Sequence, residues 1–465
     1  MKSDLPLRTR SLDTINATVA CVLANLAIVG VALVARMTFV SLLALLVLVG
    51  IAAFRPAASV AAIPAVIGFV YEQMYLGNAR FNPQEVMLVT TVAGAGLNLV
   101  WSFSRTRSIR TIRLFFAKVR VTLHVFDATA VALVVIGAVS LVTVALPAYR
   151  HESLRVFRWV ILEPVIYYVL ARWYLQDRGV RQLAIFSFAA GAVVVAIIGL
   201  IDSLSGHGLA VEGVTRISGV YPQPNALALY LERPFVLIVG IATVYRRDLA
   251  WRWLALACVM GATLILTFSR GAVLAAGLAI IVILVIGQRR RLAVIASVLG
   301  VALIAGLALT ASARIDNLFS GGSGSLRLSL WHSAIEMIRD HPIFGIGLDQ
   351  FLYVYAPRYI KPQAWSERFT SHPHDIVLDT WLSLGIMGIV LALVFLGILA
   401  WSTVRLARYR NGLGVAAVGV MFVGIMHGLV DNGYFLPDLA LIFWFMTAII
   451  ASETLDSVRF GQQET

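Results

Sequence analysis

Residues 371–401 read SHPHDIVLDTWLSLGIMGIVLALVFLGILAW. In this stretch, two histidines and an aspartate, His372, His374 and Asp375, come directly before an apolar run from Ile376 to Trp401. A helix of about 20 apolar residues spans the hydrocarbon core of a bilayer. The stretch therefore predicts a membrane-spanning helix that begins with titratable side chains at the bilayer boundary.

Apolar runs of this kind recur along the whole chain. Of its 465 residues, 60% are hydrophobic and only 13% are charged, and the mean hydropathy is +0.88. A soluble domain carries about 25% charged residues. Because helices satisfy their own backbone hydrogen bonds in lipid, the composition predicts an all-α polytopic membrane protein.

We predict a bundle of about fourteen transmembrane helices, counted from apolar runs near 20 residues long. The predicted spans are 17–35, 38–54, 58–76, 84–103, 125–146, 156–175, 182–203, 224–244, 250–268, 271–287, 292–312, 376–401, 413–430 and 438–452. With the N-terminus in the cytoplasm, the densest arginine clusters, at 104–124, 288–291 and 402–412, all fall inside. This agrees with the positive-inside rule.

The longest predicted outside segment is a periplasmic loop at residues 313–374. It contains a glycine hinge at 321–324 and a helical apolar pattern from Leu326 to Arg339, which ends before Pro342. A helix of this kind could lie on the membrane surface. The loop divides the chain into a first bundle at 1–312, the loop at 313–374, and three last spans with a cytoplasmic tail at 375–465.

Several classes of function are disfavoured by the sequence. The formal net charge is +13, but the positive-inside rule accounts for it, so we expect no nucleic-acid partner. The chain has no Asp-x-Asp pair, no Gly-x-x-x-x-Gly-Lys phosphate loop and no zinc-type cysteine and histidine spacing. We therefore expect metal-independent chemistry without a cofactor.

His374 is the first candidate for chemistry. A neutral imidazole can take a proton from a hydroxyl group near neutral pH, although a histidine at a helix start can also be only an interfacial cap. His372 competes with it for this role. Asp375 and Asp379 are four residues apart, so either could orient the histidine, while Asp375 could equally be a helix-start carboxylate.

Three arginines fall on the same predicted side of the membrane. Arg270 joins two spans with almost no loop, so it either has a partner or extends to the interface. Arg327 precedes Trp331 by about one turn, on a helix that either binds phosphate or only covers the surface. Arg216 lies in a tight loop before Asn225, which could cap the next helix. Clustered cations and a base would suit glycosyl transfer from a lipid diphosphate.

Three further charges fall inside apolar runs. Glu163 lies beside a proline in the middle of a predicted span, and Glu232 and Arg233 interrupt another. Because Glu232 and Arg233 are adjacent, we expect them to point to different sides of a helix and to find separate partners. They either join structural ion pairs or form the floor of a cavity.

Three stretches carry a resemblance to a known family. They are RISGVYPQPNALALYL at 216–231, TFSRGA at 267–272, and a third that runs from Arg327 and Trp331 through DHPIFGIG at 340–347 to His374, Leu378, Gly385 and Gly388. In their order and spacing they are similar to the bacterial O-antigen ligase and O-antigen polymerase superfamily. The resemblance covers about the C-terminal half of the chain.

The resemblance implies a metal-independent glycosyltransferase of the GT-C type in the bacterial inner membrane, with its active site facing the periplasm. Donor and acceptor would be glycans on undecaprenyl diphosphate among membrane lipids, with a chain-length regulator as an optional partner. His374 would be the base. Arg270 and Arg327, with Arg216 as a further candidate, would grip the diphosphate. The family usually has asparagine where this chain has Asp375, which leaves the role of that residue open.

Four functions are compatible with these patterns. A span count near fourteen favours an O-antigen polymerase, which joins lipid-linked repeat units. An O-antigen ligase, which moves the glycan to lipid A-core or to a protein, is the alternative. A lipid transporter would suit the buried charges, but the inverted repeat of many transporters is not visible. A structural scaffold gives no reason for the outside arginines and the boundary histidine.

Overall fold

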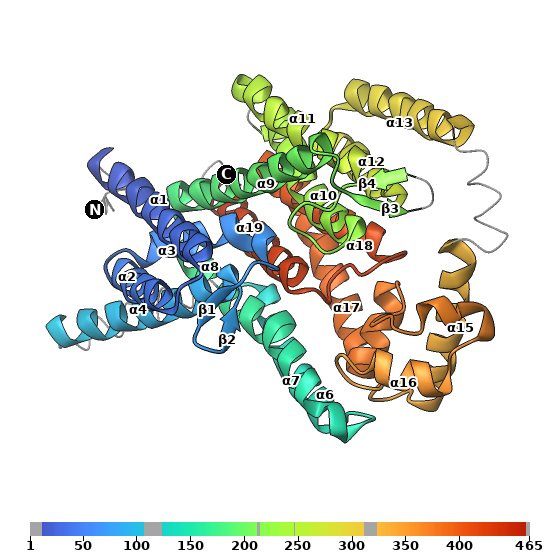
Figure 1. The fold of residues 1–465 in the computed structure, drawn as a ribbon. Coiled ribbons are helices and arrows are strands. Elements are labelled where there is room, and N and C mark those ends of the chain that lie inside the picture. The colour runs from blue at the N-terminus through green and yellow to red at the C-terminus, as the bar shows by residue number, and fades with distance from the viewer. Residues whose placement is uncertain (1–11, 107–122, 212–213, 246, 311–322, 462–465) are drawn as a thin grey trace. The chain divides into compact units, whose positions relative to one another are not determined.

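The computed structural model describes residues 12–106, 123–211, 214–245, 247–310 and 323–461, and these are almost entirely helical (Figure 1). The chain falls into two compact units. One comprises Met1–Val121 and Trp173–Gly191, and the other comprises Thr122–Arg172 and Ala192–Thr465. The basic cluster predicted at 104–124 and the glycine hinge predicted at 321–324 lie mainly at positions outside the described residues.

The first unit is a group of helices with one short hairpin. Its elements are α1 (Leu12–Ala35), α2 (Thr38–Phe54), α3 (Pro56–Val66), the antiparallel strands β1 (Met74–Leu76) and β2 (Ala79–Phe81), α4 (Pro83–Thr106) and the first part of α9 (Arg178–Leu204). Small residues allow the helices to pack closely. A Cβ added to Gly191 would lie 2.0 Å from the backbone oxygen of Ala65, so these two backbones touch.

The second unit contains the later helices. They are α6 (Val125–Val142), α7 (Arg150–Val156), most of α8 (Glu163–Tyr174), the end of α9, α10 (Pro224–Gly240), α11 (Ala250–Leu266), α12 (Arg270–Ile286), α13 (Arg290–Thr310), α15 (Ser323–Asp340), α16 (Phe351–Arg358), α17 (Ile376–Arg408), α18 (Gly412–Gly428) and α19 (Pro437–Gly461). Strands β3 (Leu209–Val211) and β4 (Val214–Arg216) form an antiparallel hairpin. Helix α18 packs against α10, α12, α17 and α19, so it lies at the centre of this unit.

Every predicted span falls on a helix, although the segment at 58–76 is helical only as far as Phe69. Among the described residues, 7 helices are long and apolar enough to cross a membrane, and five shorter helices are also apolar. The prediction of an all-α polytopic membrane protein is therefore confirmed. The number of spans stays a prediction.

Helix α17 is broken at Gly385, where φ is 67° and ψ is −166°. The segment after α15 fills the break. The N–H group of Ile346 donates to the carbonyl oxygen of Leu382 at 2.7 Å, and the N–H group of Ile386 donates to that of Ile343 at 3.0 Å. These bonds satisfy backbone groups that a broken helix would otherwise leave without partners.

Glycine is required at the break because the two backbones approach so closely. A Cβ added to Gly385 would lie 2.1 Å from the carbonyl oxygen of Ile343. A Cβ added to Gly345, where φ is also 67°, would lie 2.3 Å from the carbonyl oxygen of Leu382. The DHPIFGIG stretch and the glycines of α17 are thus two halves of one packing contact.

Helices α15 and α16 pack beside the first half of α17 and share a small core with it (Figure 1). The buried residues of this core are Leu330, Ala334, Met337, Ile346, Phe351, Val354, Tyr355 and Leu382. The helix predicted from Leu326 to Arg339 is confirmed as α15. Its apolar face packs against other parts of the protein, and its position on the membrane surface stays a prediction.

We expect Gly385→Ala to destabilise the protein by at least about 2 kcal/mol, because a Cβ at a positive φ would overlap the backbone of Ile343. Gly397→Ala in the same helix is the matched control, since a Cβ there would meet nothing within 4 Å. The control should change stability by less than about 1 kcal/mol. Thermal unfolding in detergent measures both variants. Equal melting temperatures for the two would contradict the packing role of the break.

Candidate functional site

The candidate site is built around His374, which directly precedes α17. Its Nδ1 atom lies 3.0 Å from Oδ1 of Asp431, a residue in the turn between α18 and α19. Asp431 is only 4% exposed, and its Oδ1 also accepts a hydrogen bond from the N–H group of Asn432 at 2.8 Å. A buried carboxylate with two partners of this kind holds the imidazole in one orientation.

The charge of Asp431 determines which ring nitrogen of His374 carries a proton. Burial by itself would raise the pKa of Asp431, but the imidazoles of His374 and His372 hold this pKa well below its usual range. The carboxylate is therefore ionised and can only accept, so Nδ1 of His374 must be the donor. In a neutral imidazole this leaves Nε2 without a proton and able to act as a base.

Two more predicted residues surround the same carboxylate. Nη2 of Arg327 lies 3.6 Å from Oδ2 of Asp431. The ring of His372 lies 4.3 Å from that of His374, while its Nε2 atom is 3.8 Å from Oδ1 of Asp431, too long for a hydrogen bond. Trp331, one turn after Arg327, has a buried Nε1 with no hydrogen-bond partner among the described residues. Three predicted residues thus meet at an aspartate that sequence reasoning assigned no role.

Asp375 does not orient His374. Its Oδ1 atom accepts hydrogen bonds from the backbone N–H groups of Val377 and Leu378, both at 2.9 Å. It is therefore the N-cap of α17, the second of the two roles considered for it. Asp379 is buried and accepts a hydrogen bond from Ser383 at 3.3 Å. The imidazole is paired with Asp431, which is 57 residues away in the sequence.

Arg216 links the first two family-like stretches. Its Nε atom donates to the backbone oxygen of Thr267 at 2.7 Å, and its Nη2 atom donates to Oδ1 of Asn225. Asn225 was expected to cap α10, and this prediction was wrong. The N-cap position belongs to Gln223, whose side chain makes no capping bond, and Pro224 follows it as the first helical residue. Asn225 instead holds the guanidinium of Arg216.

Arg270 is the first residue of α12, at the tight junction that the sequence predicted. A Cβ added to the next residue, Gly271, would lie 2.7 Å from Nε2 of His427 in the last turn of α18. Directly after it, Gly428 packs against Ile376 at the start of α17. The Arg270 end of α12 and the His374 end of α17 therefore meet the same end of α18. Convergence of Arg216 and Arg270 with His374 on one ligand stays a prediction.

A buried charge network lies behind the Asp431 turn. Nδ1 of His427 is 2.8 Å from Oε2 of Glu232, and Nη1 of Arg233 is 3.2 Å from Oε1 of the same carboxylate. Nη2 of Arg233 donates to the backbone oxygen of Gly433 at 3.0 Å, which fixes the turn to α10. Glu232 and Arg233 do find separate partners, in His427 and the backbone oxygen of Gly433, but they also form an ion pair with each other, which was not expected.

Glu163, the third charge inside an apolar run, has a simpler environment. Its Oε1 atom lies 3.4 Å from Nε of Arg158, one turn earlier in the chain. Arg158 is partly exposed, whereas Glu163 is nearly buried. Of the two alternatives left open by the sequence, this geometry favours a structural ion pair.

One group of side chains in the described residues has the spacing of a metal site. His372, His374 and Asp431 each offer a ligand atom, and these atoms lie within 4.8 Å of one another. Imidazole and carboxylate groups can bind Zn²⁺, although here Nδ1 of His374 already donates to Asp431. Metal-independent chemistry therefore stays a prediction, which a chelator can test.

Together, the fold and the site define a polytopic helical membrane protein with a histidine–carboxylate pair and an arginine where a broken helix begins. Residues 253–393 match the family model described as O-antigen ligase. The matched range contains Arg270, Arg327 and His374, and it includes the break at Gly385. This match supports the O-antigen ligase and polymerase superfamily, which implies a membrane glycosyltransferase-like enzyme. No curated protein matches the chain.

We expect Asp431→Asn to lower glycan transfer by ~10²–10⁴-fold, because an amide can hold the imidazole in the wrong tautomer and does not stabilise its charged form. Asp375→Asn is the matched control. Asparagine caps helices as well as aspartate, so this variant should keep its activity within about twofold. Initial rates in proteoliposomes measure both. If Asp375→Asn is the damaging change and Asp431→Asn is not, the assignment of the partner is wrong.

Proposed function

We propose that this protein is an O-antigen polymerase of the inner membrane. It would transfer a glycan from undecaprenyl diphosphate to the terminal sugar hydroxyl of another lipid-linked repeat unit, at the periplasmic face. The observation that carries this proposal is the His374–Asp431 pair with Arg327 beside it. Transfer from a lipid diphosphate needs a base to deprotonate the acceptor hydroxyl and a cation to stabilise the leaving diphosphate, and the site offers one of each.

In the proposed reaction, His374 is the general base. The oxygen of the acceptor hydroxyl forms a bond to the anomeric carbon of the donor sugar, and its proton passes to Nε2 of His374. Asp431 keeps Nδ1–H in place and stabilises the imidazolium that results. His372 lies against the same ring, so it is a neighbour rather than the partner of the carboxylate.

The cations act on the leaving group. As the bond between the anomeric carbon and the phosphate oxygen breaks, undecaprenyl diphosphate keeps the bonding electrons. A guanidinium has five N–H donors in a planar fork, so Arg327 can bind phosphate oxygens while it faces Asp431. Arg270 and Arg216 would also bind the diphosphate. Their position supports this role, because Arg270 begins α12 and Arg216 is hydrogen-bonded to Thr267 just before it. Trp331 would stack against a sugar.

A ligase is the second candidate function, and the matched family is itself described as O-antigen ligase. A ligase would use the same donor and the same base but would transfer the finished glycan to lipid A-core or to a protein hydroxyl. A count of about fourteen spans would favour the polymerase, because polymerases of the superfamily tend to have more spans, but this count stays a prediction. The family match gives no support for a chain-length regulator as a partner of this protein.

Reconstitution with lipid-linked repeat units alone separates the two functions. Longer lipid-linked glycans are the expected product of the polymerase. If product forms only after lipid A-core or a protein acceptor is added, the protein is a ligase.

In the same assay, His374→Ala should lower the rate by ~10²–10⁴-fold, because it removes the base. EDTA should leave the wild-type rate unchanged. A lipid transporter would instead keep its activity in the His374→Ala variant, and that outcome would overturn the proposed chemistry.

A further inference from the structure

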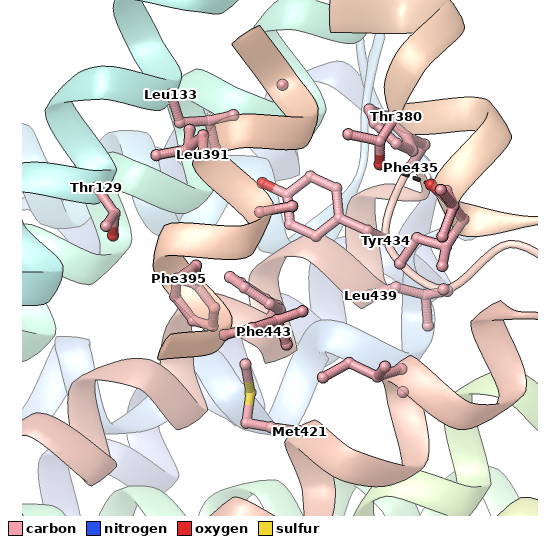
Figure 2. A pocket seen from close by; sticks show the side chains of 18 of the residues that line it. Thr129, Leu133, Thr380, Leu391, Phe395, Met421, Tyr434, Phe435, Leu439 and Phe443 are labelled. Carbon is pink, nitrogen blue, oxygen red and sulfur yellow. Dashed lines mark hydrogen bonds between the residues drawn. The ribbon is translucent and has the colours of Figure 1, made fainter. Parts of the chain in front are cut away.

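Two cavities of the second unit differ in their chemistry. The larger lies beside the candidate site and is lined mostly by carbon, with Phe395 and Phe443 among its side chains (Figure 2). The smaller has a volume of about 190 Å³, and its lining is mainly polar and includes Arg289, Arg410 and Gly412. We call this smaller cavity the arginine pocket. The reaction proposed above does not use it.

The arginine pocket lies where the ends of η4 (Ile241–Tyr245), α12 and α17 meet the start of α18. A Cβ added to Gly412 would lie 2.4 Å from the carbonyl oxygen of Val244, so α18 begins directly against η4. Arg270 begins α12 and His374 precedes α17, so the candidate site is at the other end of both helices. The sequence predicts the cytoplasm at the end that holds the pocket.

The two arginines of the pocket have no carboxylate beside them. No acidic residue belongs to the lining, and neither guanidinium forms an ion pair or a hydrogen bond with another described residue. Arg289 is partly buried, and its Nε atom is fully buried without a hydrogen-bond partner in the described part of the chain. A buried donor without an acceptor is costly, so native proteins seldom retain one unless something binds it.

Two simpler explanations of these arginines fall short. The positive-inside rule accounts for cations at this end of the helices, but a cation that only sets topology stays in water. Helix C-termini also attract cations through unpaired carbonyl oxygens. Here backbone groups already bond such oxygens, because the N–H group of Arg289 donates to Leu284 at 2.7 Å and that of Asn411 donates to Leu406 at 2.9 Å. The guanidinium groups remain available to a ligand.

The backbone gives a second sign that the pocket has a function. Arg410 has a φ of 51° and Gln288 has a φ of 58°, and both residues line the pocket. Each stands just after the end of its helix, where this left-handed conformation favours glycine. Residues held in such a conformation cluster at ligand sites, where the side chain is needed in spite of the strain.

We propose that the arginine pocket binds a phosphate group, carried by an anionic lipid or present as a free ion. A guanidinium offers N–H donors in a planar fork that matches phosphate oxygens. The start of α18 at Gly412 adds the positive end of a helix. Basic pockets between helices at the cytoplasmic face are a known form of lipid headgroup site. The volume is below the roughly 300–1,000 Å³ of most ligand pockets, so it suits one phosphate group rather than a nucleotide.

Thermal unfolding of the delipidated full-length protein in a non-ionic detergent tests the proposal, because a ligand of the folded state raises the melting temperature. The probes are inorganic phosphate and dihexanoyl phosphatidylglycerol below its micelle concentration. Sodium chloride at the same ionic strength controls for screening, and dihexanoyl phosphatidylcholine controls for a lipid without net charge. We expect the melting temperature to rise with at least one probe and with neither control.

Three variants locate the effect. Arg410→Gly and Arg289→Gln should each raise the apparent Kd of the active probe about tenfold, because each removes a charged donor from the pocket. Arg36→Gly is the matched control and should change this Kd less than twofold. Arg36 is exposed in the first unit and has a φ of 50°, so this variant removes the same charge and the same backbone strain elsewhere.

Each outcome has a definite reading. A shift with phosphatidylglycerol alone identifies an anionic lipid as the ligand, and a shift with phosphate alone identifies a free anion. No shift with either probe, an equal shift with phosphatidylcholine, or a shift that both pocket variants retain overturns the proposal. The site is independent of glycan transfer, so His374→Ala should keep the full shift.

Discussion

The hydrogen bond between Nδ1 of His374 and Oδ1 of Asp431 is the interaction on which the candidate site depends. Asp431 is buried, so its charge needs partners, and these are the Nδ1–H group of His374, the backbone N–H group of Asn432 and the guanidinium of Arg327. The same bond selects the imidazole tautomer whose Nε2 is free to accept a proton. One buried carboxylate thus gathers the cation and the base that the proposed chemistry needs.

The scaffold holds both partners of this bond. On one side, Asp375 caps α17 and the glycine-rich segment after α15 fills the break at Gly385, so the start of the helix and the residues before it have a fixed position. On the other side, Arg233 binds the backbone oxygen of Gly433 and ties the Asp431 turn to α10. Buried charges inside the bundle thereby support a polar turn at the end of the spans.

Much of the fold could be predicted from the sequence, because lipid permits few structures other than helices and apolar runs mark them directly. His374, Arg327 and His372 could be singled out for a similar reason, since titratable groups at a bilayer boundary need an explanation. Asp431 could not be chosen in the same way. It was visible as a polar residue in a short gap between two spans, but its partner lies 57 residues earlier, and only the packing of α17 against α18 brings the two together. The pairing of Glu232 with Arg233 was missed because helical periodicity describes Cβ directions and not how long side chains bend.

The most direct test of this account is a structure of the full-length protein in a nanodisc with undecaprenyl diphosphate bound. The account predicts that phosphate oxygens lie within hydrogen-bonding distance of the Arg327 guanidinium, with Nδ1 of His374 still bonded to Asp431 and its Nε2 facing the diphosphate end of the ligand. A diphosphate bound away from Arg327, or an imidazole of His374 turned away from Asp431 in the complex, would contradict it.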